Sequence, residues 1–262
     1  MRRLEGRRAI VTGGGTGIGR ASAIRLASEG ASVLVAGRTE ATIASAVDEI
    51  RASGGAAEYI VADASVEADV QRVVARCVEL FGGLEIFYAN AGNTDSIVPL
   101  LEQEVAAWEG MFRDNVVSSF LAVKHAGRHM VEHGGGSIIL CSSTASLRAN
   151  GGAVAYSASK AAVNSLTQNA ANAFAGKNVR VNALLPGLTE TGLTKPMFDY
   201  ARDKGIENKL GKLTPMQRPG YVHEMAGVIA FLASDDSSYV DGQLIAADGG
   251  ISSTHPFGRF VL

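Results

Sequence analysis

Short runs of apolar, often β-branched residues alternate along this chain with longer segments whose apolar residues recur at a helical period. Such runs predict strands at Arg8–Thr12, Ser32–Ala36, Ala56–Val61, Leu84–Ala89, Ser137–Cys141, Val179–Leu184 and Gln243–Ala246. A helical pattern covers Ile18–Glu29 and stops at Gly30, a residue that commonly ends helices. Repeated strand–helix–strand order predicts parallel strands joined by right-handed crossovers. We therefore expect an α/β fold: a doubly wound sheet of about seven mostly parallel strands with helices on both faces.

One stretch interrupts this alternation. Residues 187–219 are rich in Thr, Lys, Gly and Pro and also carry the apolar residues Met197, Phe198 and Tyr200. Long insertions at the carboxyl ends of strands commonly form ligand walls, so we expect a substrate loop or lid here, with a plain surface loop as the alternative. No Pro/Ser-rich or charged linker divides the chain, so a single domain over residues 1–262 is expected.

Composition narrows the class of protein. The 262 residues are 47% hydrophobic and 19% charged, with a net charge of −2, which is typical of a globular protein and gives nucleic acid no basic surface to bind. The longest apolar run, residues 226–233, is too short to cross a bilayer. Two cysteines cannot build a disulfide framework. A cytoplasmic protein with no membrane or nucleic-acid partner is expected.

A glycine-rich turn directly follows the first predicted strand and opens the first helix. Its sequence is Thr12-Gly13-Gly14-Gly15-Thr16-Gly17-Ile18-Gly19, with the spacing G-x-x-x-G-x-G rather than G-x-G-x-x-G. Glycines let the backbone approach a pyrophosphate, which binds the unpaired N–H groups and the positive end of the helix. The turn predicts a dinucleotide site formed by Gly13, Gly15, Thr16, Gly17, Ile18 and Gly19.

The end of the second strand bears on which dinucleotide is bound. The acidic residue that would hold a ribose 2′-hydroxyl is missing, and the sequence there is Ala36-Gly37-Arg38-Thr39. A guanidinium suits a 2′-phosphate, although Arg38 could be an ordinary solvated arginine partly neutralised by Glu40. NADP(H) is favoured, and NAD(H) stays open as the alternative.

Tyr156 and Lys160 lie four residues apart on a predicted helix and therefore share one face. An ammonium in that place can lower the pKa of the phenol, which then exchanges a proton with the oxygen of a carbonyl or alcohol. A serine hydroxyl, for which Ser142 and Ser143 are candidates, polarises the same oxygen. By itself the Y-x-x-x-K pattern is common on solvated helix faces.

Taken together, these residues resemble the short-chain dehydrogenase/reductase family in its short, single-domain form with a Rossmann-like fold. The resemblance covers essentially the whole chain. Further matches are Asp63-Ala64 after the third strand, Asn90-Ala91-Gly92 after the fourth, Asn115, Pro186-Gly187 with Thr191, and Asp248-Gly249-Gly250.

The resemblance implies roles for these residues. Tyr156 would be the catalytic acid/base, Ser143 would orient the substrate oxygen, and Lys160 would lower the tyrosine pKa and hold the nicotinamide ribose. Asn115 would support a water relay to Lys160. The implied cofactor contacts are Asp63 and Ala64 at the adenine, Asn90, Ala91 and Gly92 beside the cofactor, and Pro186, Gly187, Thr189 and Thr191 near the carboxamide and phosphates, with Arg38 and Thr39 at the adenosine ribose.

Two departures from the family pattern are visible. The common Asn-Asn-Ala-Gly reads Ala89-Asn90-Ala91-Gly92 here, which puts local rigidity in doubt. Gly37 replaces the acid that marks NAD users, so NAD is not carried over from the family.

Other motifs in the chain could indicate a different chemistry. Ser157 and Lys160 spell S-x-x-K, but no S-D-N, K-T-G or G-x-S-x-G accompanies them, which argues against a serine hydrolase. His125, His129 and His133 share a helix stripe, yet histidines near a helix C-terminus are favoured electrostatically, so no metal site is expected. Cys141 at a strand end is expected to be a small core residue rather than a reactive thiol.

The sequence thus predicts an NADP(H)-dependent oxidoreductase that transfers hydride between a nicotinamide and a ketone or secondary alcohol. The alternatives are an NAD-dependent secondary-alcohol dehydrogenase and a non-catalytic dinucleotide-binding regulator. Pocket-wall candidates are Asn93, Thr94, Ser146, Asn150, Leu193, Met197 and Tyr200. By resemblance a homotetramer, or a homodimer, is expected. The apolar C-terminal residues 254–262 would either pack on another subunit or form a frayed tail.

Overall fold

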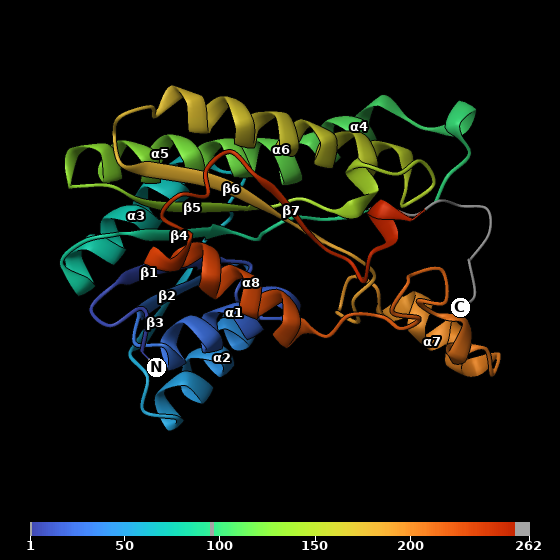
Figure 1. Ribbon diagram of the computed structural model, residues 1–262, viewed down its shortest axis with the longest axis horizontal. Coiled ribbons are helices and arrows are strands. Elements are labelled where there is room, and N and C mark those ends of the chain that lie inside the picture. The colour runs from blue at the N-terminus through green and yellow to red at the C-terminus, as the bar shows by residue number, and fades with distance from the viewer. Residues whose placement is uncertain (1, 95–96, 255–262) are drawn as a thin grey trace.

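A computed structural model describes residues 2–94 and 97–254 of the chain. Its centre is one sheet of seven strands in the order β3-β2-β1-β4-β5-β6-β7, and every neighbouring pair is parallel (Figure 1). The strands are β1 (Arg8–Thr12), β2 (Ser32–Gly37), β3 (Ala57–Val61), β4 (Ile86–Ala89), β5 (Gly136–Cys141), β6 (Val179–Pro186) and β7 (Leu244–Ala247). The doubly wound sheet predicted from the sequence is confirmed, and small differences are confined to strand ends.

Helices cover both faces of this sheet (Figure 1). One face carries α1 (Gly17–Ser28), α2 (Glu40–Ala52) and α8 (Val222–Ala233), and the other carries α3 (Glu67–Phe81), α5 (Ser118–Glu132) and α6 (Val154–Ala173). Successive strand residues point to opposite faces, so Tyr88 enters the α1/α8 core while Phe87 enters the α5/α6 core. Burial on both sides explains why the strands read as nearly continuous apolar runs.

The order of the strands reverses between β1 and β4, because the chain builds outward from β1 to β3 and then returns to the other side of β1. In such sheets a crevice opens at the carboxyl ends of the two strands that flank the reversal. The glycine-rich turn follows β1 and Asn90 follows β4, so both lie at this crevice.

The segment 187–219 contains its own helix, α7 (Lys195–Asp203), which stands apart from the layered body (Figure 1). A shorter helix, α4 (Val105–Phe112), precedes α5 on the opposite side of the same end of the molecule. Within the described residues, no helix is long and apolar enough to cross a membrane. The C-terminal tail at 255–262, for which subunit contact or fraying was expected, lies outside the described residues.

The N-terminal segment is fastened to the end of α1 by Glu29. Its carboxylate accepts from the Arg3 guanidinium at 2.7 and 2.8 Å and from Arg25 at 2.6 Å, and only 7% of its side chain is exposed. The hydrogen bonds from Arg3 are the largest cause of a lowered pKa at Glu29. Arg3 also bonds Asp236, which links this corner to the residues after α8.

We expect Glu29→Gln to lower the free energy of unfolding by about 1–3 kcal/mol at pH 7, since hydrogen bonds to charged partners are worth roughly that much. Because folding lowers the pKa of Glu29, its stabilisation is complete above the ordinary glutamate pKa and is lost as the pH falls through the lowered value. Urea unfolding followed by circular dichroism checks both the loss at pH 7 and its shrinkage in acid. The control Glu5→Gln breaks an exposed pair with Arg2 and should cost less than about 1 kcal/mol; equal losses for the two variants would contradict the assignment.

Candidate active site

The glycine-rich turn is held against the loop that follows β4. Asn90 Nδ2 donates to the carbonyl oxygens of Thr12 and Gly13, both at 3.2 Å, and the Ala91 N–H donates to Thr12 Oγ1 at 3.1 Å. Gly13 has φ +62°, a left-handed conformation that favours glycine. A Cβ on Gly19 would lie 2.3 Å from the Gly13 carbonyl oxygen, so only glycine lets helix α1 begin this close to the turn.

This arrangement resolves the doubt raised by Ala89. The alanine is a buried residue of β4, and the neighbouring Asn90 supplies the amide that pins the two loops together. The loss of one asparagine from the family pattern therefore leaves this contact in place.

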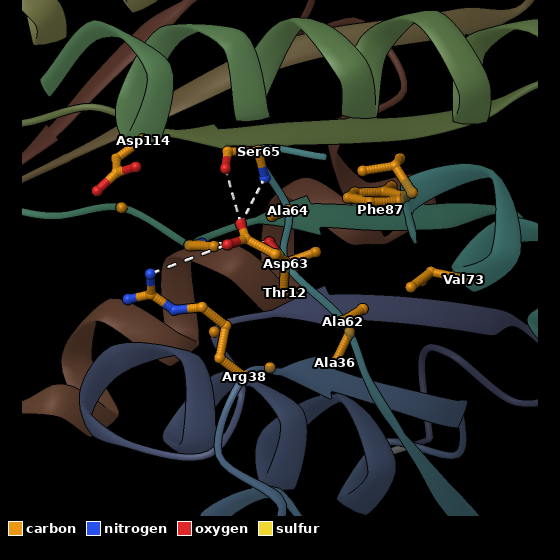
Figure 2. A pocket seen from close by; sticks show the side chains of 15 residues that line it. Thr12, Ala36, Arg38, Ala62, Asp63, Ala64, Ser65, Val73, Phe87 and Asp114 are labelled. Atoms are coloured by element: carbon orange, nitrogen blue, oxygen red, sulfur yellow. Dashed lines mark hydrogen bonds and ion pairs between the residues drawn. The ribbon is translucent and has the colours of Figure 1, made fainter. Parts of the chain in front are cut away.

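A pocket opens beside the turn, over the carboxyl ends of β1, β2, β3 and β4 (Figure 2). Its lining combines backbone-exposing glycines, small apolar residues and a few polar side chains: Thr12, Gly13, Ala36, Gly37, Arg38, Ala62, Asp63, Ala64, Ser65, Val70, Val73, Phe87, Ala91, Gly92 and Asp114. An adenosine group needs apolar walls with a small number of polar contacts, which this lining offers. The residues present thus fit the adenosine end of a dinucleotide whose phosphates would lie on the glycine turn.

The two charged residues at the pocket mouth differ in how firmly they are held. Asp63 Oδ1 accepts from the Ser65 N–H at 2.9 Å and from Ser65 Oγ at 2.8 Å, which fixes the carboxylate. Arg38 is only loosely paired with it, at 4.0 Å, and 69% of the Arg38 side chain is exposed (Figure 2). Glu40, which could have neutralised Arg38, accepts a hydrogen bond from the Tyr59 hydroxyl at 3.1 Å. Thr39, between Arg38 and Glu40 in the sequence, is exposed and directly precedes α2.

Tyr156 and Lys160 lie in the first two turns of α6, beside the loop after β5 that carries Ser143. Lys160 is buried, its Nζ lies 5.7 Å from the centroid of the Tyr156 ring, and it donates to the Cys141 carbonyl oxygen at 2.8 Å. The Ser142 hydroxyl donates to the Lys160 carbonyl oxygen at 3.0 Å, so strand end and helix are tied together.

The pKa of the phenol runs opposite to the sequence-based expectation. Burial raises the pKa of Tyr156 to about 12, and a hydrogen bond with the Ser143 side chain opposes that rise only in part. Burial also lowers the pKa of Lys160, because a charged ammonium loses its hydration there. Loss of hydration is the largest cause of the pKa shift of both Tyr156 and Lys160. The arrangement gives a protonated phenol at neutral pH.

Asn115 occupies a wide, π-helical turn at Arg113–Val117, between α4 and α5. It is fully buried, accepts from the Asn93 N–H at 2.8 Å, and donates to the Asn93 carbonyl oxygen at 3.0 Å and to Ser159 Oγ at 2.9 Å. A Cβ added to Gly92 would lie 2.7 Å from Asn115 Oδ1 and 3.3 Å from Lys160 Nζ. Asn115 and Lys160 therefore both border Gly92, in a space that admits no side chain there.

The segment after β6 closes the remaining side. Gly187 approaches the backbone of Asp248 so closely that a Cβ would lie 2.6 Å from its Cα atom. Thr189 is buried and donates to the Gly187 carbonyl oxygen at 3.1 Å. The Thr191 side chain lies 3.2 Å from the place a Cβ of Gly17 would take, so the 187–219 segment begins against the glycine turn. Pro186, the last residue of β6, continues into this segment.

The structure thus brings the predicted catalytic and cofactor-binding residues together at the carboxyl ends of the strands. Sequence reasoning missed Asp114, which lines the pocket and accepts from Asn93 Nδ2 at 3.4 Å, and Ser65, which holds Asp63. The available signals were the position of Asp114 next to Asn115 and the Asp-x-Ser spacing, in which a carboxylate accepts from the backbone two residues on.

The histidines have other partners. His125 contacts the Glu67 carboxylate at 2.9 Å, and the rings of His129 and His133 stack with centroids 4.1 Å apart. Across residues 2–94 and 97–254, no three His, Cys, Asp or Glu side chains come together as a metal site. Cys141 is partly buried and packs against the α1/α8 core.

Comparison with known proteins bears on the family of this chain independently of the site geometry. A family model described as enoyl-(acyl carrier protein) reductase matches residues 13–252. The 7alpha-hydroxysteroid dehydrogenase of Clostridium sardiniense is 37% identical over 258 residues, which are 98% of this chain and 97% of that protein.

Solved structures agree in fold over nearly the full length. The crystal structure of levodione reductase has a TM-score of 0.92 at 31% identity and covers 97% of this chain and 100% of its own. The gluconate 5-dehydrogenase from Burkholderia cenocepacia J2315, in complex with NADP and tartrate, has a TM-score of 0.89 at 35% identity, covering 97% and 98%. With the matching residues gathered at one crevice, these comparisons show that the chain belongs to the short-chain dehydrogenase/reductase family and is an oxidoreductase of that family.

Proposed function

We propose that this protein is an NADP(H)-dependent reductase of ketones, with Tyr156 as the proton donor. The observation that carries the proposal is the convergence of Ser143, Tyr156 and Lys160, with Lys160 Nζ bordering Gly92 in the loop that holds the glycine turn. When bound, the nicotinamide supplies or accepts the hydride.

The chain's own residues supply the proton and the oxyanion contacts. The Tyr156 hydroxyl donates its proton to the oxygen of the carbonyl as negative charge develops there, and the Ser143 hydroxyl donates a hydrogen bond to the same oxygen. Lys160 would hold the nicotinamide ribose when the cofactor is bound, and its Nζ lies beside the Tyr156 ring. Asn115 keeps the Asn93 backbone and Ser159 in place and supports proton resupply toward Lys160.

The raised pKa of Tyr156 keeps the phenol in the protonated form that ketone reduction uses at neutral pH. Reduction consumes a proton that a phenol with a pKa of about 12 carries throughout the neutral range. Oxidation of an alcohol needs the phenolate, which is scarce at the same pH.

Arg38 supports the choice of NADP(H). Its guanidinium lies at the pocket mouth, loosely paired and exposed, where a 2′-phosphate would offer a stronger partner than Asp63. The gluconate 5-dehydrogenase from Burkholderia cenocepacia J2315, which has a similar structure, is in complex with NADP. NAD(H) is the weaker alternative because no acid follows β2 at the position of Gly37.

Substrate and assembly are proposed only by class. A small ketone or secondary alcohol fits a site with Ser143 and Tyr156 at its base. A cytoplasmic homotetramer is the proposed assembly, with a homodimer as the simpler form. Val117 just before α5, Phe120 on α5 and Val154 on α6 expose apolar side chains, and α5 and α6 cover the same face of the sheet, which favours association of copies there.

Tyr156→Phe should remove nearly all turnover, by about 10²-fold or more, since positioned general acids contribute on that scale. NADPH affinity should change little because the ring is kept. Oxidation of NADPH against a ketone panel, followed by absorbance, measures turnover, and titration of cofactor fluorescence measures binding. Tyr239→Phe, at a fully exposed position, is the matched control; an active Tyr156→Phe enzyme would refute the proposal.

The pH profile should differ between the two directions. Because Tyr156 stays protonated up to a pKa of about 12, reduction should hold its rate from about pH 6 to 9 and decline only at higher pH. Alcohol oxidation should rise about tenfold per pH unit over the same range, as the phenolate fraction does. Initial rates in both directions test this, with tryptophan fluorescence confirming that the protein stays folded. A reduction rate that falls with a midpoint near neutrality would contradict it.

Arg38→Met should raise the KM for NADPH by roughly 10-fold or more, the loss expected for one charge-assisted contact to phosphate, and leave the KM for NADH nearly unchanged. Steady-state kinetics with the two cofactors give the comparison. Arg51→Met removes an arginine paired with Glu58 at the end of α2 and serves as the control. Equal effects on the two cofactors would favour NAD.

A further inference from the structure

The loop that carries Ser143 is tied to the turn after β7 by a single arginine. Arg148 Nε donates to the Ser252 carbonyl oxygen at 3.2 Å, and Nη2 donates to the carbonyl oxygens of Ile251 at 3.1 Å and Ser252 at 2.9 Å. Nη2 also donates to the Thr254 carbonyl oxygen. A planar guanidinium can serve several carbonyls at once, which an ammonium on a flexible chain does poorly.

Within the loop before Arg148, hydrogen bonds connect the neighbouring residues to Ser143. Ser146 Oγ donates to the Ser143 carbonyl oxygen at 2.5 Å and accepts from Asn164 Nδ2 of α6 at 2.8 Å. Thr144 Oγ1 donates to the Pro186 carbonyl oxygen at 3.2 Å. A shift of Arg148 would therefore be transmitted to the backbone of Ser143.

On the other side, the turn at residues 248–254 supports the lid. Asp248 shapes it by accepting from the N–H groups of Gly250 at 2.9 Å and Ser252 at 2.8 Å. The Met216 N–H donates to the Gly249 carbonyl oxygen at 3.3 Å, and a Cβ on Gly250 would lie 2.8 Å from the Pro215 ring. The turn is thus packed between the Ser143 loop and the far end of the 187–219 segment.

Arginines that bind several carbonyls are often purely structural, and this chain contains one for comparison. Arg180 on β6 donates to the carbonyl oxygens of Leu232 at 3.0 Å, Val240 at 3.3 Å and Ser234 at 3.3 Å. It lies near the amino end of β6, whereas Ser143 follows the carboxyl end of β5. Arg148 and Arg180 thus both bind several backbone carbonyls, but only Arg148 does so from the loop that carries Ser143.

We propose that Arg148 is a positioning residue for the reaction: by clamping the carbonyls of residues 251, 252 and 254 to the Ser143 loop, it makes the 248–254 turn a wall of the substrate site and sets the position of the serine hydroxyl. The inference rests on the proposed function of Ser143. Its consequence is that loss of the clamp should displace Ser143 and widen the site, with little effect on the glycine turn at the other end of the crevice.

The test compares Arg148→Met and Arg148→Lys with Arg180→Met. Hydrogen–deuterium exchange on the cofactor-free protein reports on peptides covering residues 142–147 and 248–254. Steady-state reduction of cyclohexanone and of the bulkier 1-decalone with NADPH gives kcat and KM, and cofactor fluorescence gives the Kd for NADPH.

For Arg148→Met we expect faster exchange in both peptides and a fall in kcat of about 10- to 100-fold with both ketones, the scale expected for a small misplacement of a reacting group. The Kd for NADPH should stay within about twofold, and Arg148→Lys should recover part of kcat. Arg180→Met should lower the Tm but leave kcat and the exchange of residues 142–147 unchanged.

The inference is overturned if Arg148→Met leaves the exchange of residues 142–147 unchanged, or if Arg180→Met reproduces its loss of kcat. The exchange arm needs no turnover. If the wild-type protein reduced neither ketone, the proposed function would lose its support, while the coupling of the two segments through Arg148 would still be decided.

Discussion

The contact between Asn90 and the carbonyls of Thr12 and Gly13 is the one on which the rest of the crevice depends. β1 and β4 are paired in the sheet as far as Thr12 and Ala89, and beyond these residues the chain leaves the two strands toward opposite faces, which opens the crevice. One side-chain amide joins the two loops by donating to the carbonyl oxygens of both Thr12 and Gly13. From this fixed point, the backbone of Ala91 and Gly92 runs directly to Asn115 and Lys160.

Desolvation then determines the acid–base character of the site. Lys160 is buried between the end of β5 and the loop at Gly92, and Tyr156, one turn earlier on α6, packs its ring against Gly152. Enclosure disfavours the charged form of each group, so the lysine and the phenol are both driven toward neutrality. The Ser143 hydroxyl acts in the other direction on the phenol. The balance depends on burial as much as on the chemical identity of the residues.

The sequence was a good guide to what depends on local pattern. Strands buried on both faces give continuous apolar runs, and a glycine-rich turn between a strand and a helix is a local feature, so both were predicted near their observed positions. The contribution of Asn90 could not be read from the sequence, because it depends on which loop the β4 end faces. The direction of the Tyr156 pKa was missed for a similar reason: the spacing of Tyr156 and Lys160 shows that they share a helix face, but says nothing of the solvent each loses. Asp114 and the helix α7 within residues 187–219 were also missed, since the lining of a pocket and the structure of a long insertion arise from tertiary packing.

The π-helical turn at Arg113–Val117 has a consequence for how this end of the molecule can diverge. A π turn accommodates one residue more than an α turn, so it resets the rotational phase between the helix before it and the helix after it. Helix α5 is anchored in the core by Ala122, Ala126 and Met130, whereas α4 leads directly into Asp114, which lines the pocket. With the phase absorbed at Asn115, insertions or deletions in the preceding loop can rotate α4 without turning α5 in its packing. The mouth of the crevice can therefore be remodelled in evolution while its floor keeps its geometry.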